Sequence, residues 1–172
     1  MWRSHPWLRK GETLVMKQKT GPAGNVRVIA TNRKARHEYH IDDTWEAGIV
    51  LRGTEVKSLR CGGGSVVDSY AEPEGGEIWL NNFHINPYEQ GNRYNVDEKR
   101  RRKLLLNKKQ IRKIVGLCTQ KGYTLIPLRL YFLGQHVKVE LALARGKKAY
   151  DKRQDIRERD ARRELDRDYK VR

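Results

Sequence analysis

Apolar residues in this chain recur mainly in short runs of strand length, separated by turns that contain glycine. The clearest run is His136–Ala144, where positions 137, 139, 141 and 143 are Val, Val, Leu and Leu, and positions 138, 140 and 142 are Lys, Glu and Ala. Successive side chains of a β-strand point to opposite faces of the sheet. The alternation therefore predicts a strand with one buried face and one face in water.

Five further runs have the length and the β-branched or aromatic content of strands. They are Val26–Ala30, Ala47–Leu51, Ser65–Ala71, Glu77–Ile85 and Tyr123–Phe132. The glycine-containing segments Glu72–Gly76 and Leu133–Gln135 are predicted to connect neighbouring strands as hairpin loops.

Two helices are expected between the strands. Asn107 can cap a helix with Gln110 three residues later, and apolar residues then recur at helical spacing from Ile111 to Cys118, with Gly122 as the stop. A shorter helix fits Thr54–Arg60, which lies between two glycine-containing turns.

This order of elements favours a mainly β protein, an OB-like antiparallel β-barrel with two or three added helices. Barrels of this type often bind nucleic acid, but that step from fold to function is an analogy. We expect a flexible extension at residues 1–25, the barrel at residues 26–145 and a basic tail at residues 146–172. The tail has few apolar residues and many acid–base pairs at helical spacing, so we expect it to be disordered when free and helical when docked.

The composition of the chain indicates the chemical class of its binding partner. The 172 residues are 37% hydrophobic and 34% charged, and 37 Lys and Arg against 21 Asp and Glu leave a formal charge of +16. A surplus of this size indicates a polyanionic partner, for which nucleic acid is the usual candidate.

No apolar run approaches a membrane span and the N-terminus lacks the apolar core of a secretory signal. Because Cys61 and Cys118 stand far apart with no second pair, we expect reduced cysteines and a cytoplasmic protein.

Three basic clusters are candidate phosphate contacts. The densest is the run Lys99–Lys103, within a span from 93 to 113 that holds ten basic residues and two acids. The others are Asn32–His37 and Gly146–Arg153, and the second of these contains Tyr150, a candidate stacking platform for an unpaired nucleotide.

Enzyme chemistry is weakly indicated. Asp42 and Asp43 precede Glu55 and Lys57 in a loose match to an acidic nuclease pattern that could hold Mg²⁺, but Glu55 and Lys57 fit a plain helix equally well. Two histidines, His37 and His40, have no partners at zinc-site spacing, so no metal or other cofactor is expected.

Several long segments together resemble the small protein B family, the bacterial SsrA-binding proteins. The resemblance covers the chain from about Val26 onward, and its motifs are Asn32–Tyr39, Glu46–Arg60, Arg102–Asn107, Lys121–Phe132 and Lys138–Arg153. The segment Gly91–Arg101 departs from the family in being more basic and in lacking its usual proline, which leaves the path of that loop open.

The resemblance implies a non-enzymatic RNA-binding factor. It would bind the tRNA-like domain of tmRNA and deliver it to stalled ribosomes for trans-translation, with elongation factor Tu as a further partner through the shared tmRNA. Carried over by position, the implied tmRNA contacts are Glu46, Leu105 and Asn107, with Arg102 and Lys103 as contacts to the RNA backbone. From the basic cluster Asn32–His37 we add Asn32, Arg33 and Lys34 as expected tmRNA contacts.

The resemblance also implies that the tail enters the decoding centre of the small ribosomal subunit. Its implied contacts are Gly146, Lys147, Lys148, Tyr150, Asp151, Lys152 and Arg153. Composition alone supports a general binder of structured RNA equally well, and that alternative stays open at this point.

Overall fold

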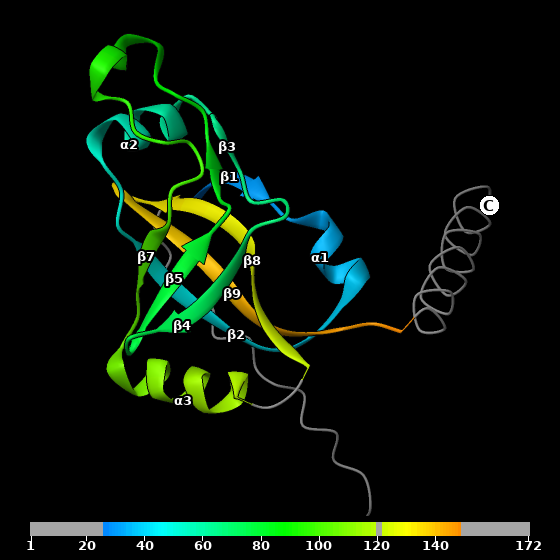
Figure 1. Cartoon of the computed structure of the whole chain (residues 1–172). Helices are drawn as coiled ribbons and strands as arrows, with labels where there is room; N and C mark the ends of the chain where they lie inside the picture. Colours follow the sequence, from blue (N-terminus) through cyan, green and yellow to red (C-terminus); the bar gives the residue numbers. More distant parts are fainter. Residues whose placement is uncertain (1–25, 120–121, 149–172) are drawn as a thin grey trace, which may run out of the picture.

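The computed structural model describes residues 26–119 and 122–148, which form a β-barrel with helices at its ends and side (Figure 1). In chain order the elements are β1 (Val26–Thr31), α1 (Arg33–Glu38), β2 (Tyr39–Ile49), α2 (Gly53–Arg60), β3 (Gly64–Ser65), β4 (Tyr70–Glu74), β5 (Glu77–Asn81), β6 (His84–Ile85), the 3-10 element η1 (Glu89–Tyr94), β7 (Arg102–Leu105), α3 (Lys108–Cys118), β8 (Tyr123–Leu133) and β9 (His136–Gly146).

The main sheet closes on itself. Its strands pair in the order β8, β4, β5, β7, β2 and β9, and β9 pairs again with β8, every pair being antiparallel. β1 adds to β8 at Arg129–Leu133, beyond the single pair that β8 makes with β4. Closure leaves few unpaired strand edges in the sheet. The predicted antiparallel barrel with added helices is confirmed.

The alternation predicted for β9 is found over most of the strand. Its apolar positions from Val137 to Leu143 are buried in the core, and Lys138 and Glu140 are partly exposed on the outer face. Ala142 is the exception, because α1 covers the outer face there and packs Ala35 into a second apolar cluster with Ala142 and its neighbours. The prediction that position 142 faces water is therefore wrong.

Other boundaries shift for local reasons. The predicted second strand is the end of a longer one, since β2 begins at Tyr39. The helix α1 was not predicted, although Asn32 caps it, its Oδ1 accepting from the N–H of Ala35 at 3.1 Å. The capping box of Asn107 and Gln110 is confirmed, whereas α3 ends at Cys118, before the predicted glycine stop.

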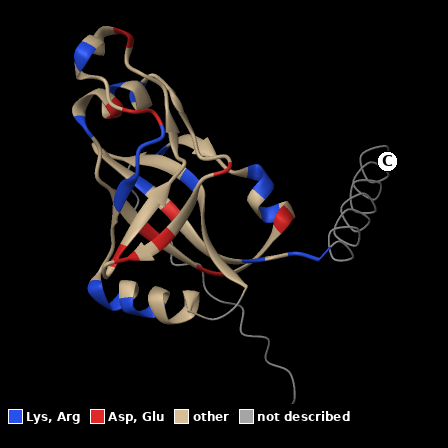
Figure 2. Ribbon diagram, viewed as in Figure 1, with Lys and Arg blue, Asp and Glu red and all other residues tan. Residues whose placement is uncertain are grey.

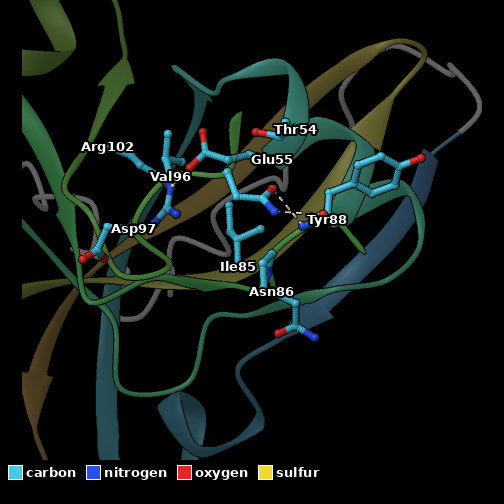
Figure 3. Close-up of a pocket in the computed structure, with 10 residues that line it drawn as sticks. Thr54, Glu55, Ile85, Asn86, Tyr88, Val96, Asp97 and Arg102 are labelled. Atoms are coloured by element: carbon cyan, nitrogen blue, oxygen red, sulfur yellow. Dashed lines mark hydrogen bonds and ion pairs between the residues drawn. The ribbon is translucent and has the colours of Figure 1, made fainter. Parts of the chain in front are cut away.

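One charged pair lies in the interior at the upper end of the barrel. Arg102 from β7 is completely buried and Glu55 from α2 is 4% exposed, with the Arg102 Nε donating to a Glu55 carboxylate oxygen at 2.9 Å (Figure 3). The Arg102 guanidinium also donates to the carbonyls of Phe83, Arg100 and Glu98. The pair thus joins α2, β7 and the segment between β5 and β7.

The hydrogen-bonding and charged partners of Glu55 keep its carboxyl group ionised. Burial alone would raise the pKa of its carboxyl group, but hydrogen bonds from Arg100 and from the backbone of Arg52, with the charge of Arg102, lower it below 4.5 overall. Burial lowers the pKa of the Arg102 guanidinium, and the Glu55 carboxylate opposes that shift. Both groups are therefore charged at neutral pH.

We expect Glu55→Gln to destabilise the protein by about 3–5 kcal/mol, because removing one member of a buried pair leaves the other charge without compensation. Urea unfolding followed by tryptophan fluorescence measures this. As a control, Arg101→Gln removes ion pairs to Glu72 and Glu74 from a side chain that is 47% exposed, and should cost at most about 1 kcal/mol. Equal losses in the two variants would contradict a structural role for the buried pair.

The same comparison has a defined pH dependence. Because the folded pKa of Glu55 lies below its unfolded value of 4.5, its stabilisation is present above 4.5 and is lost as the pH falls through the folded pKa. The stability difference between the natural chain and Glu55→Gln should therefore shrink below pH 4.5. A difference that is constant over this range would overturn the assignment.

Candidate nucleic-acid interface

The outer face of the barrel brings Glu46 and Leu105 close together. In the sheet register Gly48 of β2 lies opposite Leu105 of β7 on one side and Lys138 of β9 on the other. Glu46 is two residues before Gly48, so its side chain emerges on the same face. Leu105 is 52% exposed, an unusual position for a large aliphatic side chain in a closed barrel.

Gly48 allows this arrangement. A Cβ placed on it would come within 3.3 Å of the Cβ of Leu105, closer than ordinary contact. Without one, the Leu105 side chain lies against bare backbone and presents its other side to solvent.

The Glu46 carboxylate is fixed by two neighbours on that face. The Tyr131 hydroxyl donates to one oxygen at 2.5 Å, and the Lys138 Nζ lies 3.2 Å from the other. The hydrogen bond from Tyr131 is the main reason that the pKa of Glu46 is lowered, and Lys138 adds to it. Burial and the adjacent carboxylate raise the pKa of Tyr131. Glu46 is therefore an oriented, charged acceptor on an exposed surface.

The neighbouring basic run is mostly used within the protein. Arg100 pairs with Glu55, Arg101 with two glutamates of the β4–β5 hairpin, and Lys103 with Glu77. Arg102, a predicted tmRNA contact, is completely buried and has no surface that RNA could reach. Of the phosphate-binding patch predicted at Lys99–Lys103, Arg102 is thus inaccessible, whereas Arg101 and Lys103 stay partly exposed beside their glutamate partners.

The exposed positive charge lies on α3 instead. Asn107, at its start, accepts a hydrogen bond from the N–H of Lys109 at 3.0 Å. Lys108, Lys109 and Arg112 are exposed, and the first turn contains no acid. Cations oppose the dipole at the N-terminus of a helix. This arrangement costs helix stability and favours an anion that approaches the helix start.

A second basic cluster surrounds α1 and the root of the tail. Arg33 and Lys34 are exposed on α1, whereas Asn32 is buried as its cap. Lys147 donates from its backbone N–H to the Glu38 carbonyl at 2.9 Å and from Nζ to a carbonyl at the end of α1.

The tail root lies at the start of β2. Gly146 pairs with Tyr39 there, whereas Glu46 lies further along the same strand. Lys148 is exposed and is the last residue of the described range. The remaining predicted tail contacts lie outside the described residues, namely Tyr150, Asp151, Lys152 and Arg153.

The nuclease alternative gains no support from the geometry. Asp43 pairs with Lys113 of α3 at 2.5 Å, whereas Glu55 is buried with two arginines at the other end of the barrel. Within residues 26–119 and 122–148, no cluster of three or more His, Cys, Asp or Glu could hold a metal ion. Among the same residues, no helix is long and apolar enough to cross a membrane.

Sequence reasoning missed three residues of the outer face. Gly48, Tyr131 and Lys138 lie far apart in sequence and meet only through the pairing of β2 with β7 and β9, and of β9 with β8. Alternation alone does not give the register, so only a correct strand pairing would have found them.

The comparisons with known proteins identify the family of the chain. Residues 29–171 match the family described as SmpB protein. The SsrA-binding protein of Pelotomaculum thermopropionicum is 57% identical over 147 residues, 86% of this chain and 96% of that protein. The SsrA-binding protein of Geobacillus thermodenitrificans is 53% identical over 151 residues, 88% of this chain and 97% of that protein.

A solved structure is similar as well. It is described as "tmRNA-SmpB: a journey to the center of the bacterial ribosome", and one of its chains is 54% identical to this one with a TM-score of 0.60, covering 69% of this chain and 84% of its own. The family match extends from β1 to the tail and includes every surface described above. The chain therefore belongs to the SmpB protein family.

Proposed function

We propose that this protein binds the tRNA-like domain of tmRNA and delivers it to stalled ribosomes for trans-translation. The observation that carries the proposal is the register that sets Leu105 against Gly48 beside the oriented carboxylate of Glu46. Membership of the SmpB family, and relatives named for SsrA binding, supply the identity of the RNA.

The two central residues suit different parts of an RNA. A carboxylate only accepts hydrogen bonds, so Glu46 can bind base amino groups or ribose 2′-hydroxyls and would repel phosphate. The exposed Leu105 can pack against an unstacked base. A regular duplex offers no unstacked base, and neither contact is made to phosphate, which favours recognition of a folded RNA over general charge attraction.

Basic residues around this centre would hold the phosphates. Lys108, Lys109 and Arg112 follow directly from the Leu105–Asn107 segment. Lys103 flanks Leu105 on β7, and its Glu77 partner would have to give way to phosphate. Arg33 and Lys34 on α1 lie further along the outer face and would extend the contact.

In this proposal the protein acts by binding and no catalytic residue is assigned. The tail from Gly146 to Arg153 would contact the decoding centre of the small subunit, with Tyr150 stacking on an rRNA base. Elongation factor Tu would join through the shared tmRNA, and the protein would act in the cytoplasm, where its ribosomes are. The +16 charge favours a second candidate function, a general binder of structured RNA.

Leu105→Ala should weaken binding to the tRNA-like domain about fivefold, because the variant loses roughly half of the free energy gained by burying a leucine side chain. Val28→Ala is the matched control: Val28 is 51% exposed, Leu105 is 52% exposed, and Val28 lies on β1. Fluorescence anisotropy at two salt concentrations measures both, with an ordinary tRNA and duplex DNA as competitors. Equal affinity for all three ligands, fading together with salt, would leave only the general RNA binder.

Changing both Lys108 and Lys109 to Ala should have opposite effects on binding and stability. The slope of log affinity against log salt should fall by about 1 to 2, one per lost phosphate contact. Removing cations from the helix start should leave stability unchanged or raise it by about 0.3–1 kcal/mol. Salt titrations and urea unfolding give the two values, and an unchanged salt slope would remove α3 from the interface.

Replacing Tyr150, Asp151, Lys152 and Arg153 by alanine should separate RNA binding from ribosome rescue. Affinity for the tRNA-like domain should stay within about twofold, because the proposed contacts with that domain lie on the barrel. Tagging on stalled ribosomes should be lost. A reconstituted translation reaction on an mRNA without a stop codon measures tagging. Normal tagging by this variant would contradict the proposed role of the tail.

A further inference from the structure

The end of the barrel opposite α3 carries a second exposed surface, built from α2 and the loop that contains η1 (Figure 1). This loop includes Gly91–Arg101, the segment in which the sequence departs from the family. Tyr94 is its most exposed large hydrophobic residue, with 67% of its surface accessible.

The loop is held rigidly. The Asn95 side chain bonds both backbone groups of Tyr88, accepting from its N–H at 3.1 Å and donating to its carbonyl at 2.9 Å. Gly91 lies over this amide, and a Cβ there would overlap it. The Thr54 hydroxyl of α2 donates to the Tyr94 carbonyl at 3.3 Å. A large ring is thus exposed on a fixed support, so little ordering entropy is lost when it binds a partner.

Both tyrosines of this surface carry a cation on their rings. The guanidinium carbon of Arg93 lies 5.2 Å from the centre of the Tyr94 ring, and the Lys57 Nζ lies 5.6 Å from the centre of the Tyr88 ring. Aromatic rings beside basic side chains are the usual platform for an unpaired nucleotide, whose base stacks while its phosphate meets the cation.

The surface continues the interface already described. The N–H of Val50, just after β2, donates to the Lys103 carbonyl at 3.0 Å, and Val50 is 44% exposed. In Figure 2 the Lys and Arg residues of η1 and of the start of α3 lie along the same side of the molecule, near its two ends. An RNA that contacts α3 can therefore also reach η1 if it follows this side of the barrel.

We propose that Tyr94, with Arg93 beside it, is a stacking site for an unpaired base of RNA at the α2–η1 end of the barrel. This inference rests on the proposed RNA-binding function and extends it to a surface separate from Glu46 and Leu105. The base can belong to tmRNA or to ribosomal RNA, because the same chemistry serves both.

The experiment compares Tyr94→Ala with Tyr94→Trp in the full-length chain. Binding is measured by anisotropy with the isolated tRNA-like domain, and by sedimentation with purified small ribosomal subunits. Tyr94→Ala should weaken binding to one of the two RNAs about 5-fold to 100-fold, the range for loss of one stacked base, and Tyr94→Trp should restore it. The RNA that responds identifies the source of the base.

Tyr70→Ala is the matched control, since Tyr70 is 46% exposed on β4 and lies outside this surface. Unchanged binding of Tyr94→Ala to both RNAs overturns the proposal, as does a Tyr70→Ala loss of equal size. Failure of the proposed function would look different: the natural chain itself would show no preference for the tRNA-like domain over an ordinary tRNA.

Discussion

The buried pair of Arg102 and Glu55 is the constraint on which the upper half of the structure depends. An arginine with no exposed surface must satisfy all its donors inside the protein, and here they reach one carboxylate and three backbone carbonyls. Those acceptors lie on α2, at Phe83 just before β6, and at Glu98 and Arg100 in the segment just before β7. The pair therefore fixes where β7 begins, and the register of β7 in turn sets Leu105 opposite Gly48.

This use of charge explains why a basic protein need not be basic everywhere on its surface. Four bases of the run from 100 to 103 are matched by acids from α2, β4 and β5, and they hold the barrel together. The bases of α3, placed where they oppose the helix dipole, have no such compensation in their first turn. The density of charge along the sequence therefore does not show which bases are left for a partner, whereas the ion pairs in the structure do.

The sequence predicted most of the elements because their signals are local. The alternation of β9, the cap at Asn107 and the turn at Gly134 each act within a few residues, and all are found apart from the outer position Ala142. Two predictions are wrong in part, because β4 runs to Glu74 and leaves only Gly75 and Gly76 as the turn of the predicted loop Glu72–Gly76, and because the predicted strand Ser65–Ala71 is strand only at its two ends. The short helix α1 was not predicted, because Asn32–His37 was interpreted as a basic cluster and the capping role of Asn32 was overlooked. Nothing local distinguished Arg102, which is buried, from Arg101, which is exposed. Gly48 and Tyr131 acquire their roles only through strand pairing, so the geometry around Glu46 required the structure.

The double pairing of β9 has a mechanical consequence. This strand is bonded along both edges, to β2 and to β8, and its last residue leads directly into the tail. A pull along the axis of β9 would strain its backbone hydrogen bonds to both neighbours together. They would therefore not break one after another from the end. The contacts of Lys147 with α1 lie ahead of them and would break before the strand moved. Under a pull on this end of the chain, the hydrogen bonds of Lys147 to α1 would therefore open while the pairing of β9 with β2 and β8 stays intact.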